Sequence, residues 1–204
     1  SKLSKNIVNA EKAWPIVAPG IWLEIRGRPT VLPRPGLFLD RDGVIVADNG
    51  FLATPNDVEL LPGAAELIAE ANRCAVPVAV VTNQSGIARK LFGWAAFADV
   101  EREITRRLAA AGARLEAVLA CPFHPEFTAE YGDVESHWRK PGPGLVVAAA
   151  RLLNIEIGTS WLVGDRTRDV EAARNAGLAG AILLSGEAAS PPRIPEPTYP
   201  GTEF

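Results

Sequence analysis

The sequence predicts a doubly wound α/β fold with a parallel sheet, and two patterns support this prediction. Short apolar runs alternate with longer segments whose apolar residues recur at helical spacing, which is typical of strands and crossover helices in turn. In addition, polar residues follow the apolar runs, at Asp40, Thr82 and Asp165. Right-handed crossovers bring the carboxyl ends of parallel strands to one edge of the sheet. Ligands bind at that edge, so we expect these residues and Lys140 to lie together there.

Length and composition indicate one globular domain. The chain has 204 residues, of which 48% are hydrophobic and 22% charged, enough for one well-buried core. The formal net charge of -3 and the pI near 5.5 give no basic footprint, so nucleic acid and anionic membranes are not expected as partners. No apolar run approaches membrane-spanning length. Cys74 and Cys121 lie in different expected elements and no secretory signal opens the sequence, which favours a cytoplasmic location.

We expect the chain to divide into three segments. Residues 1–36 are rich in proline around one strand-like run, 20–26, and are interpreted as an N-terminal extension packed on the domain. Residues 37–189 form the domain. Residues 190–204 form a proline-rich C-terminal tail, extended or disordered. In the extension, Trp14 and Trp22 are more typical of packing residues than of ligand contacts.

The elements of the domain follow from local patterns. The run 37–45 predicts a buried strand that ends at two acids and turns at Gly43. The turn-rich stretch 44–61 predicts a small hairpin over the site. The apolar run 76–81 suits a strand buried on both faces. The same rules predict further strands at 115–120, 160–163 and 179–184, and helices at 63–75, 94–111, 145–153 and from the segment 164–169 through Ala176.

The helix expected over 94–111 shows the amphipathic pattern most clearly. Its apolar residues recur at helical spacing, at Phe97, Val100, Ile104 and Leu108. We interpret the arginines as a solvated face: Arg102, Arg106 and Arg107.

Asp40 and Asp42 are the candidate catalytic residues. They stand two residues apart where the strand ends, so both side chains emerge toward the same side. Two carboxylates this close are costly unless a cation lies between them or one stays protonated. Asp40 could then act as a nucleophile and Asp42 as a proton shuttle. The alternative is that the pair only caps a turn, which Asp often does.

Later segments favour the catalytic interpretation. Asp165 could join Asp40 and the carbonyl of Asp42 in holding a hard divalent cation through oxygen alone, which favours magnesium over zinc. Lys140 could neutralise a phosphoryl dianion, and the hydroxyl of Thr82 could bind its oxygens, although Thr82 also suits a helix-capping turn. Together these residues predict phosphoryl transfer through an aspartyl-phosphate at Asp40.

Asp169 has two interpretations. It could lie beside the metal ligands without touching the metal, or it could be an ordinary acid in the first turn of a helix, where negative charge is favoured.

Four motifs resemble, in order, those of the haloacid dehalogenase-like (HAD) phosphatases. They occupy residues 40–43 (Asp-Arg-Asp-Gly), 82–86 (Thr-Asn-Gln-Ser-Gly), 139–141 (Arg-Lys-Pro) and 164–166 (Gly-Asp-Arg). The resemblance covers residues 37–184 and implies a sheet of the HAD type and dependence on Mg²⁺. It also implies a role for each matching residue: nucleophile Asp40, acid/base Asp42, phosphate binding by Thr82, Asn83 and Lys140, substrate contact by Arg139, and metal ligation by Asp165.

No cap domain is expected on this core. The stretch 43–62 is too short for a helical insertion, and 121–138 is too short for a sheet insertion. The active site should therefore be open on one side.

Within the family, the motifs most resemble the heptose bisphosphate phosphatases and the histidinol-phosphatases. The resemblance implies a magnesium-dependent phosphomonoesterase whose partner is a small phosphorylated sugar, or alternatively histidinol phosphate. A protein of another class, a non-catalytic module that binds a phospho-ligand, is possible on the same fold. The intact acids Asp40, Asp42 and Asp165 argue against that class. The oligomeric state does not follow from the sequence.

The loop before the Arg-Lys-Pro motif departs from these relatives, whose Cys-x-His and Cys-x-Cys pairs bind a structural zinc. The corresponding residues here are Cys121, Phe123, Ser136 and Trp138, so a structural zinc is not expected. We expect Phe123, Phe127 and Trp138 to pack the loop instead.

An alternative keeps a metal in that loop. Cys121, His124 and His137 could form a displaced site, completed by Glu126 or Glu135. Otherwise the two histidines are ordinary polar residues of the loop.

Overall fold

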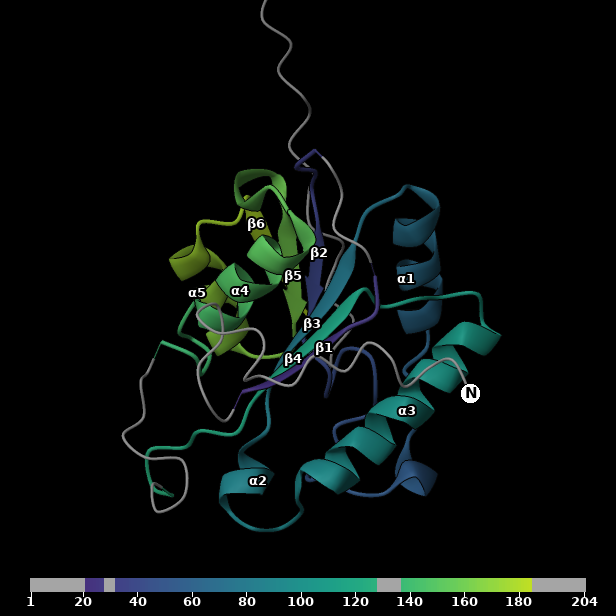
Figure 1. Ribbon diagram of the computed structural model, residues 1–204, viewed down its shortest axis with the longest axis vertical. Helices are drawn as coiled ribbons and strands as arrows, with labels where there is room; N and C mark the ends of the chain where they lie inside the picture. The colour runs from purple at the N-terminus through teal and green to yellow at the C-terminus, as the bar shows by residue number, and fades with distance from the viewer. Residues whose placement is uncertain (1–20, 28–31, 128–136, 185–204) are drawn as a thin grey trace, which may run out of the picture.

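The computed structural model describes residues 21–27, 32–127 and 137–184 (Figure 1). The strands are β1 (Trp22–Ile25), β2 (Leu37–Leu39), β3 (Val78–Asn83), β4 (Ala117–Cys121), β5 (Trp161–Gly164) and β6 (Gly180–Leu183). The helices are α1 (Ala64–Arg73), α2 (Ser85–Ala88), α3 (Trp94–Ala110), α4 (Gly144–Leu153) and α5 (Thr167–Ala176), with 3-10 turns η3 (Pro55–Asp57) and η4 (Ile157–Thr159).

The strands form one sheet in the order β1-β4-β3-β2-β5-β6. Neighbours from β4 to β6 run parallel, which confirms the doubly wound α/β fold. The expected strand at 20–26 is present as β1, and it adds an antiparallel edge beside β4. The chain winds outward from β2 to β4 and then crosses back to β5, on the other side of β2. The topological switch point therefore lies between β2 and β5, where ligands bind in such sheets.

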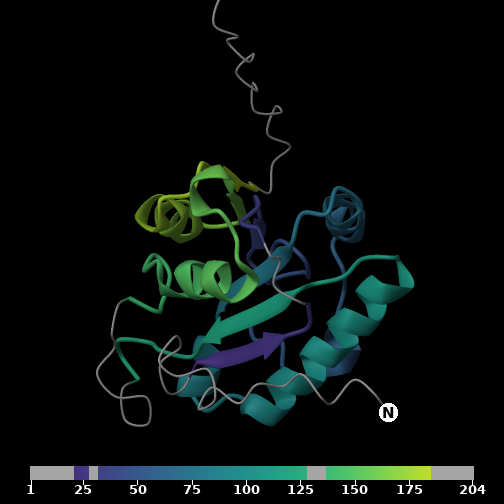
Figure 2. The ribbon, with the colours of Figure 1, turned by 45° about the horizontal axis from the view of Figure 1, so that its top comes forward.

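Helices cover both faces of the sheet. In Figures 1 and 2, α1 and α3 lie on one side, and α4 and α5 lie on the other. Side chains alternate along each strand, so one strand serves two cores. Phe38 belongs to the core under α4, whereas the next residue, Leu39, belongs to the core under α1 and α3. Both side chains are almost fully buried.

The aromatic residues of β1 and α3 confirm the predicted packing. Trp22 stacks on Trp94 with ring centroids 5.5 Å apart, and the centroids of Trp22 and Phe97, which meet edge to face, are also 5.5 Å apart. The arginines of α3 face solvent as expected, and they pair with acids on the same helix: Arg102 with Asp99, and Arg106 and Arg107 with Glu103. Trp14 lies outside the described residues.

The stretch 44–61 differs from the expected hairpin. Its ends pair antiparallel at a single bridge, Val46 with Leu60, and no regular strand forms. The middle instead contains the 3-10 turn η3, which begins at Pro55, because proline presets a turn and cannot donate to a strand ladder. The short helix α2 was also not expected as an element. Both differences, the turn η3 and the helix α2, lie in segments rich in turn-forming residues. There the local turn preferences decide the structure, and not the apolar pattern.

The described residues test only some of the expected domain limits. Residues 40–63 hold loops, bridges and one 3-10 turn, so no domain is inserted there. The segments 1–20, 28–31, 128–136 and 185–204 lie outside the description, so the extension, the tail and part of the loop after β4 stay predictions. None of the helices within the described ranges is long and apolar enough to cross a membrane.

The assignment of the core under α4 can be tested with two leucines. Leu119 on β4 is 0% exposed, whereas Leu67 on α1 is 43% exposed. We expect Leu119→Ala to lower the free energy of unfolding by about 2–5 kcal/mol, because it leaves a cavity in a packed interior. Leu67→Ala should lower it by roughly 0.5 kcal/mol. Urea unfolding followed by circular dichroism would measure both, and equal losses would contradict the assignment.

Candidate active site

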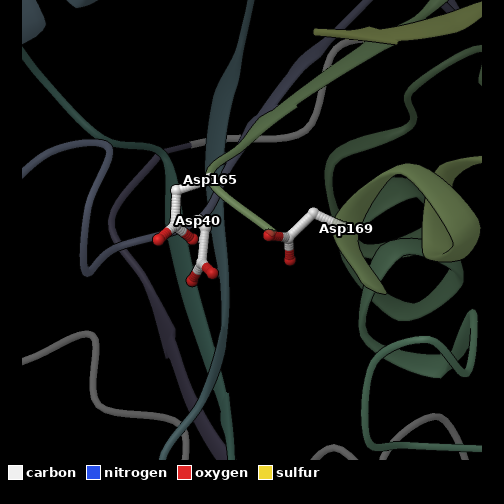
Figure 3. A group of neighbouring side chains, drawn as sticks. All are labelled: Asp40, Asp165 and Asp169. Carbon is white, nitrogen blue, oxygen red and sulfur yellow. The ribbon is translucent and has the colours of Figure 1, made fainter. Parts of the chain in front are cut away.

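Three carboxylates meet at the switch point. Asp40 directly follows β2, Asp165 directly follows β5, and Asp169 reaches toward them from the first turn of α5 (Figure 3). One oxygen of each lies within 4.8 Å of the others. Among the described residues, this is the one group of acids, histidines and cysteines arranged to hold a metal ion. Because every ligand is a carboxylate oxygen, the group suits a hard cation such as Mg²⁺.

The backbone at Gly43 comes very close to Asp165. Gly43 has a φ of 77°, and a Cβ built on it would lie 2.5 Å from Asp165 Oδ2. Only glycine therefore lets the turn after β2 pass beside this carboxylate. Burial raises the pKa of Asp165 above its usual value and Asp40 adds to the shift, while Arg166 opposes it. A bound cation would offset this cost by stabilising both carboxylates.

Lys140 neutralises two of the three acids. Its Nζ lies 2.8 Å from Asp40 Oδ2 and 2.7 Å from Asp169 Oδ1, and the lysine side chain is fully buried. The other oxygen of Asp169 accepts a hydrogen bond of 3.0 Å from the backbone N–H of Arg166, as part of a capping box on α5. Asp169 thus pairs with Lys140 and also caps its helix. Its predicted place beside the metal ligands stays a prediction.

Asn83 holds the backbone of Lys140. Its Nδ2 donates to the carbonyl of Lys140 at 3.0 Å, and its Oδ1 accepts from the N–H of Lys140 at 3.0 Å. Asn83 therefore positions the lysine, and its predicted contact with phosphate stays a prediction. The hydroxyl of Thr82 accepts a hydrogen bond of 2.9 Å from Gln84 Nε2. A hydroxyl that accepts one bond still has its own O–H to donate to an anion.

The side chain of Asp42 points toward a different set of partners. Arg41 Nε donates to Asp42 Oδ1 and Arg41 Nη2 donates to Oδ2, each at 3.0 Å. Gln84 Nε2 donates to Oδ2 at 2.8 Å. The carboxylate of Asp42 is consequently not a member of the three-acid group. The metal contact predicted for this residue is made by its backbone carbonyl, and it stays a prediction.

A cavity of about 130 Å³ lies in front of these residues. The loop 44–61 supplies part of its wall, as expected from its predicted place over the site. Asp48 in that loop pairs with Arg166 at 2.9 Å, which ties the loop to the start of α5. The lining residues are Asp40, Asp42, Asp48, Gly50, Phe51, Thr82, Asn83, Gln84, Ser85, Asp165 and Arg168.

Arg139 lies beside this cavity and does not line it. It borders a neighbouring hollow with His137 and Pro141, and one Nη donates to the carbonyl of Phe123 at 2.9 Å. Burial lowers the pKa of Arg139, and the positive charges of Arg168 and Arg89 lower it further. Its predicted contact with substrate stays a prediction.

Apolar residues pack the described part of the loop before the Arg-Lys-Pro motif. Phe123 and Trp138 are buried in the core under α4, as expected, together with Cys121. Phe127 lies under the guanidinium of Arg89, which is 4.4 Å from its ring centroid. Ser136 lies outside the described residues.

The residues of the alternative metal site have other surroundings. Burial raises the pKa of the Cys121 thiol to about 12, so it is not a thiolate at neutral pH. His124 Nε2 lies 3.1 Å from an Nη of Arg89, and the ring of His137 packs edge-on against Trp138. Glu135 lies outside the described residues.

Comparison with known proteins identifies the family. A family model described as HAD-hydrolase-like matches residues 137–202. The D-glycero-beta-D-manno-heptose-1,7-bisphosphate 7-phosphatase of Mesorhizobium japonicum is 42% identical over 179 residues, covering 87% of this chain and 82% of that protein. The chain belongs to the HAD-like phosphatases. The resemblance in its motifs is thereby confirmed, and the chain is a phosphoric monoester hydrolase of the HAD type.

Further relatives agree with this membership. The enzyme of the same name from Rhodopseudomonas palustris is 37% identical, covering 72% of this chain and 82% of that one. A crystal structure from Mesorhizobium loti, described as a HAD-like phosphatase, matches with a TM-score of 0.79 at 42% identity, covering 87% and 86% of the two chains. The D,D-heptose 1,7-bisphosphate phosphatase of B. bronchiseptica, complexed with magnesium and phosphate, matches with a TM-score of 0.63 at 35% identity, covering 70% and 77%.

Several residues at the HAD-type site were not predicted from the sequence. Arg41 and Gln84 bind Asp42, and Glu101 on α3 binds Arg41 at 3.2 Å. Two signals could have found them. Arg41 stands between two acids, and Glu101 falls on the apolar stripe of its helix, where a charge needs a buried partner. The other residues of the cavity wall that were not predicted as site residues carry no comparable signal: Asp48, Gly50, Phe51, Ser85 and Arg168.

The contact between Gly43 and Asp165 can be tested by a single methyl group. We expect Gly43→Ala to displace the Asp165 carboxylate and to raise the Mg²⁺ concentration needed for half-maximal activity about ten-fold or more. Gly63→Ala is the control, because Gly63 has a similar φ of 84° but no atom within 4 Å of the added Cβ. It introduces comparable backbone strain away from the acids. Equal Mg²⁺ requirements in the two variants would contradict this account.

The two cysteines should react very differently. Cys74 is exposed, whereas Cys121 is buried with a pKa of about 12. Because the thiolate is the nucleophile, iodoacetamide at about pH 8 should alkylate Cys74 and leave Cys121 unmodified until the protein is unfolded in urea. Peptide mass spectrometry before and after unfolding would measure this. Labelling of both cysteines in the folded protein would argue against a packed loop.

Proposed function

We propose that the chain hydrolyses a phosphorylated sugar through an aspartyl-phosphate formed on Asp40. The observation that carries this proposal is the position of Asp40 at the end of β2, facing the cavity with Lys140 Nζ 2.8 Å from its Oδ2. A carboxylate can attack phosphorus only if the negative charge of the phosphoryl group is compensated. Lys140 supplies one such charge directly at the nucleophile.

The proposed reaction has two steps. A carboxylate oxygen of Asp40 bonds to phosphorus while the bond to the sugar oxygen breaks, and Asp42 gives its proton to that oxygen. Water then attacks phosphorus, Asp42 takes a proton from it, and the bond to Asp40 breaks to release phosphate. Thr82 donates its hydroxyl to a phosphoryl oxygen. Backbone and side-chain contacts orient the nucleophile, since Asp40 Oδ1 accepts from the N–H of Arg41 at 2.7 Å.

Mg²⁺ suits this site and is the metal of the family. Asp40 and Asp165 would hold it, with the carbonyl of Asp42, and Asp169 would keep Lys140 beside them. One oxygen each of Asp40 and Asp165 lie within 4.8 Å of each other, which is close enough to share one cation. When bound, Mg²⁺ would supply positive charge to the phosphoryl oxygens.

The relatives suggest the substrate. Proteins at 42% and 37% identity are named heptose-1,7-bisphosphate 7-phosphatases, so a heptose bisphosphate is our leading candidate. Arg139 and Arg168 lie near the cavity and could meet a second anionic group of such a sugar. We further propose a cytoplasmic location. A non-catalytic binding module is not favoured, because Asp40 and Asp42 both line the cavity and Lys140 pairs with Asp40.

The proposal is tested by phosphate release. Purified protein would be assayed against heptose 1,7-bisphosphate, other sugar phosphates, histidinol phosphate and p-nitrophenyl phosphate, with Mg²⁺ and then with excess chelator. We expect magnesium-dependent release that is fastest for the heptose bisphosphate. Release that is unaffected by chelator would contradict the metal assignment. Faster release from histidinol phosphate would identify that compound as the substrate in place of the heptose bisphosphate.

Asp40→Asn tests the nucleophile. The amide keeps the shape of the side chain but cannot attack phosphorus, so we expect activity to fall roughly a thousand-fold or more. Thermal unfolding and circular dichroism would verify that the variant is folded. Activity within ten-fold of the unmodified protein would rule out the aspartyl-phosphate at this position.

A further inference from the structure

Arg41 and Glu101 form an ion pair inside the protein. Each is 1% exposed, and the distance from Arg41 Nη1 to Glu101 Oε1 is 3.2 Å. Neither residue lines the active-site cavity. Removing two charges from water costs about as much as their attraction returns, so a buried pair of this kind is seldom explained by stability alone. The pair is therefore better explained by the side chain that it holds in place.

The guanidinium of Arg41 connects Glu101 to Asp42. Its Nη1 donates to Glu101, while Nε and Nη2 face the two oxygens of Asp42. Its Nη2 also donates to Gln84 Oε1 at 3.1 Å. The Phe97 ring supports the flat face, with its centroid 5.3 Å from Arg41 Cζ. These contacts on two edges and one face fix the orientation of the planar guanidinium. Its Nε and Nη2 groups therefore face the two oxygens of Asp42 in a fixed geometry.

Gln84, which lines the cavity, also binds the carboxyl of Asp42. Its Oε1 accepts from Arg41, and its Nε2 donates to Asp42 Oδ2 at 2.8 Å and to Thr82 Oγ1 at 2.9 Å. The side chain of Asp42 is 22% exposed, so the carboxyl is held at the cavity wall and still reaches the cavity. Arg41 and Gln84 thus bind this carboxyl directly. Glu101 and Phe97 contact Arg41 in turn, and Thr82 contacts Gln84.

The charges around Arg41 agree with this arrangement. Burial disfavours the guanidinium, but Asp42 and Glu101 outweigh it and raise the pKa of Arg41. Burial raises the pKa of Glu101, against the opposing effects of Arg41 and Arg26. Arg26 follows β1, so this edge strand contributes both a charge near Glu101 and, through Trp22, an aromatic contact behind Phe97.

We propose that Glu101 is a positioning residue for Asp42: it orients Arg41, which with Gln84 holds the Asp42 carboxyl where it can protonate the leaving oxygen. This inference rests on the proposed function, in which Asp42 is the general acid. Glu101 itself contacts Arg41 and does not line the cavity. Its removal should therefore affect the reaction only through proton transfer.

The test uses two substrates that differ in their need for a proton. A sugar phosphate releases a strongly basic alkoxide, whereas p-nitrophenyl phosphate releases a weakly basic phenolate. The ratio kcat/KM reports the steps up to formation of the aspartyl-phosphate. For Glu101→Gln we expect kcat/KM to fall about ten-fold or more on the sugar phosphate and less than about three-fold on p-nitrophenyl phosphate. Asp42→Asn should show the same preference with a larger loss.

Glu116→Gln is the matched control. Glu116 is also a buried carboxylate, 4% exposed, and it pairs with an arginine, Arg114, at 2.6 Å. It accepts from the backbone N–H of Val78 at the far end of β3 from the site. This variant should lose stability without changing the ratio of activities on the two substrates. Thermal unfolding of all variants would separate folding from catalysis.

Each outcome decides the inference. Equal losses on both substrates in Glu101→Gln would mean a structural role only and would overturn it. If Glu101→Gln does not fold, Arg41→Lys replaces it, because lysine keeps the charge but cannot form the fork. A selective loss in Arg41→Lys would support the inference, and an equal loss would overturn it.

Failure of the proposed function would look different. Unmodified protein that releases no phosphate from either substrate would refute the proposed function together with this inference. Asp42→Asn with equal losses on both substrates would refute the general acid and leave Glu101 with nothing to position. Selective losses in both Asp42→Asn and Glu101→Gln, but not in Glu116→Gln, would support the inference.

Discussion

The ammonium group of Lys140 lies between the carboxylates of Asp40 and Asp169, and the site depends on this contact. The two distances are 2.8 and 2.7 Å, and all three side chains are buried. Without the lysine, two buried negative charges would face each other, which costs several kcal/mol. The lysine therefore lets the end of β2 and the start of α5 meet at the same place, and Asn83 holds its backbone there.

The winding of the sheet explains why these acids converge. The chain leaves β2 in one direction and returns to its other side at β5, so the loops after these two strands diverge above a gap at the switch point. Asp40 and Asp165 occupy the two sides of that gap. The loop 44–61 then closes over one side, where Asp48 pairs with Arg166 at the start of α5. The cavity is thus bounded by segments that are remote in the sequence.

Apolar side chains pack the described part of the loop after β4. The loop after β4 buries Phe123 and Trp138 against α4, where Leu145 also lies. Each buried aromatic side chain contributes a few kcal/mol through the area it removes from water. The carbonyl of Phe123 also accepts a hydrogen bond from Arg139. This hydrogen bond ties Arg139, the first residue of the Arg-Lys-Pro segment, to Phe123.

The sequence by itself determined the order of the elements and the principal residues of the site. Continuous apolar runs and amphipathic spacing are local properties, and chain order limits how strands and helices can wind, so the doubly wound fold and the edge that bears Asp40, Thr82, Lys140 and Asp165 could be predicted. The 3-10 turn at Pro55 could not be placed as easily, because short turns leave no periodic signal.

Only the tertiary structure decided which side chains touch. Glu101 and Arg41 are separated by 60 positions in the chain, and nothing local indicates that they pair. Asn83 likewise turns to the backbone of Lys140, although its residue type equally suits phosphate. Such partners follow from the relative placement of helices and strands, which depends on packing over the whole sheet. The identity of the reactive groups is thus a property of the sequence, whereas their orientation is a property of the fold.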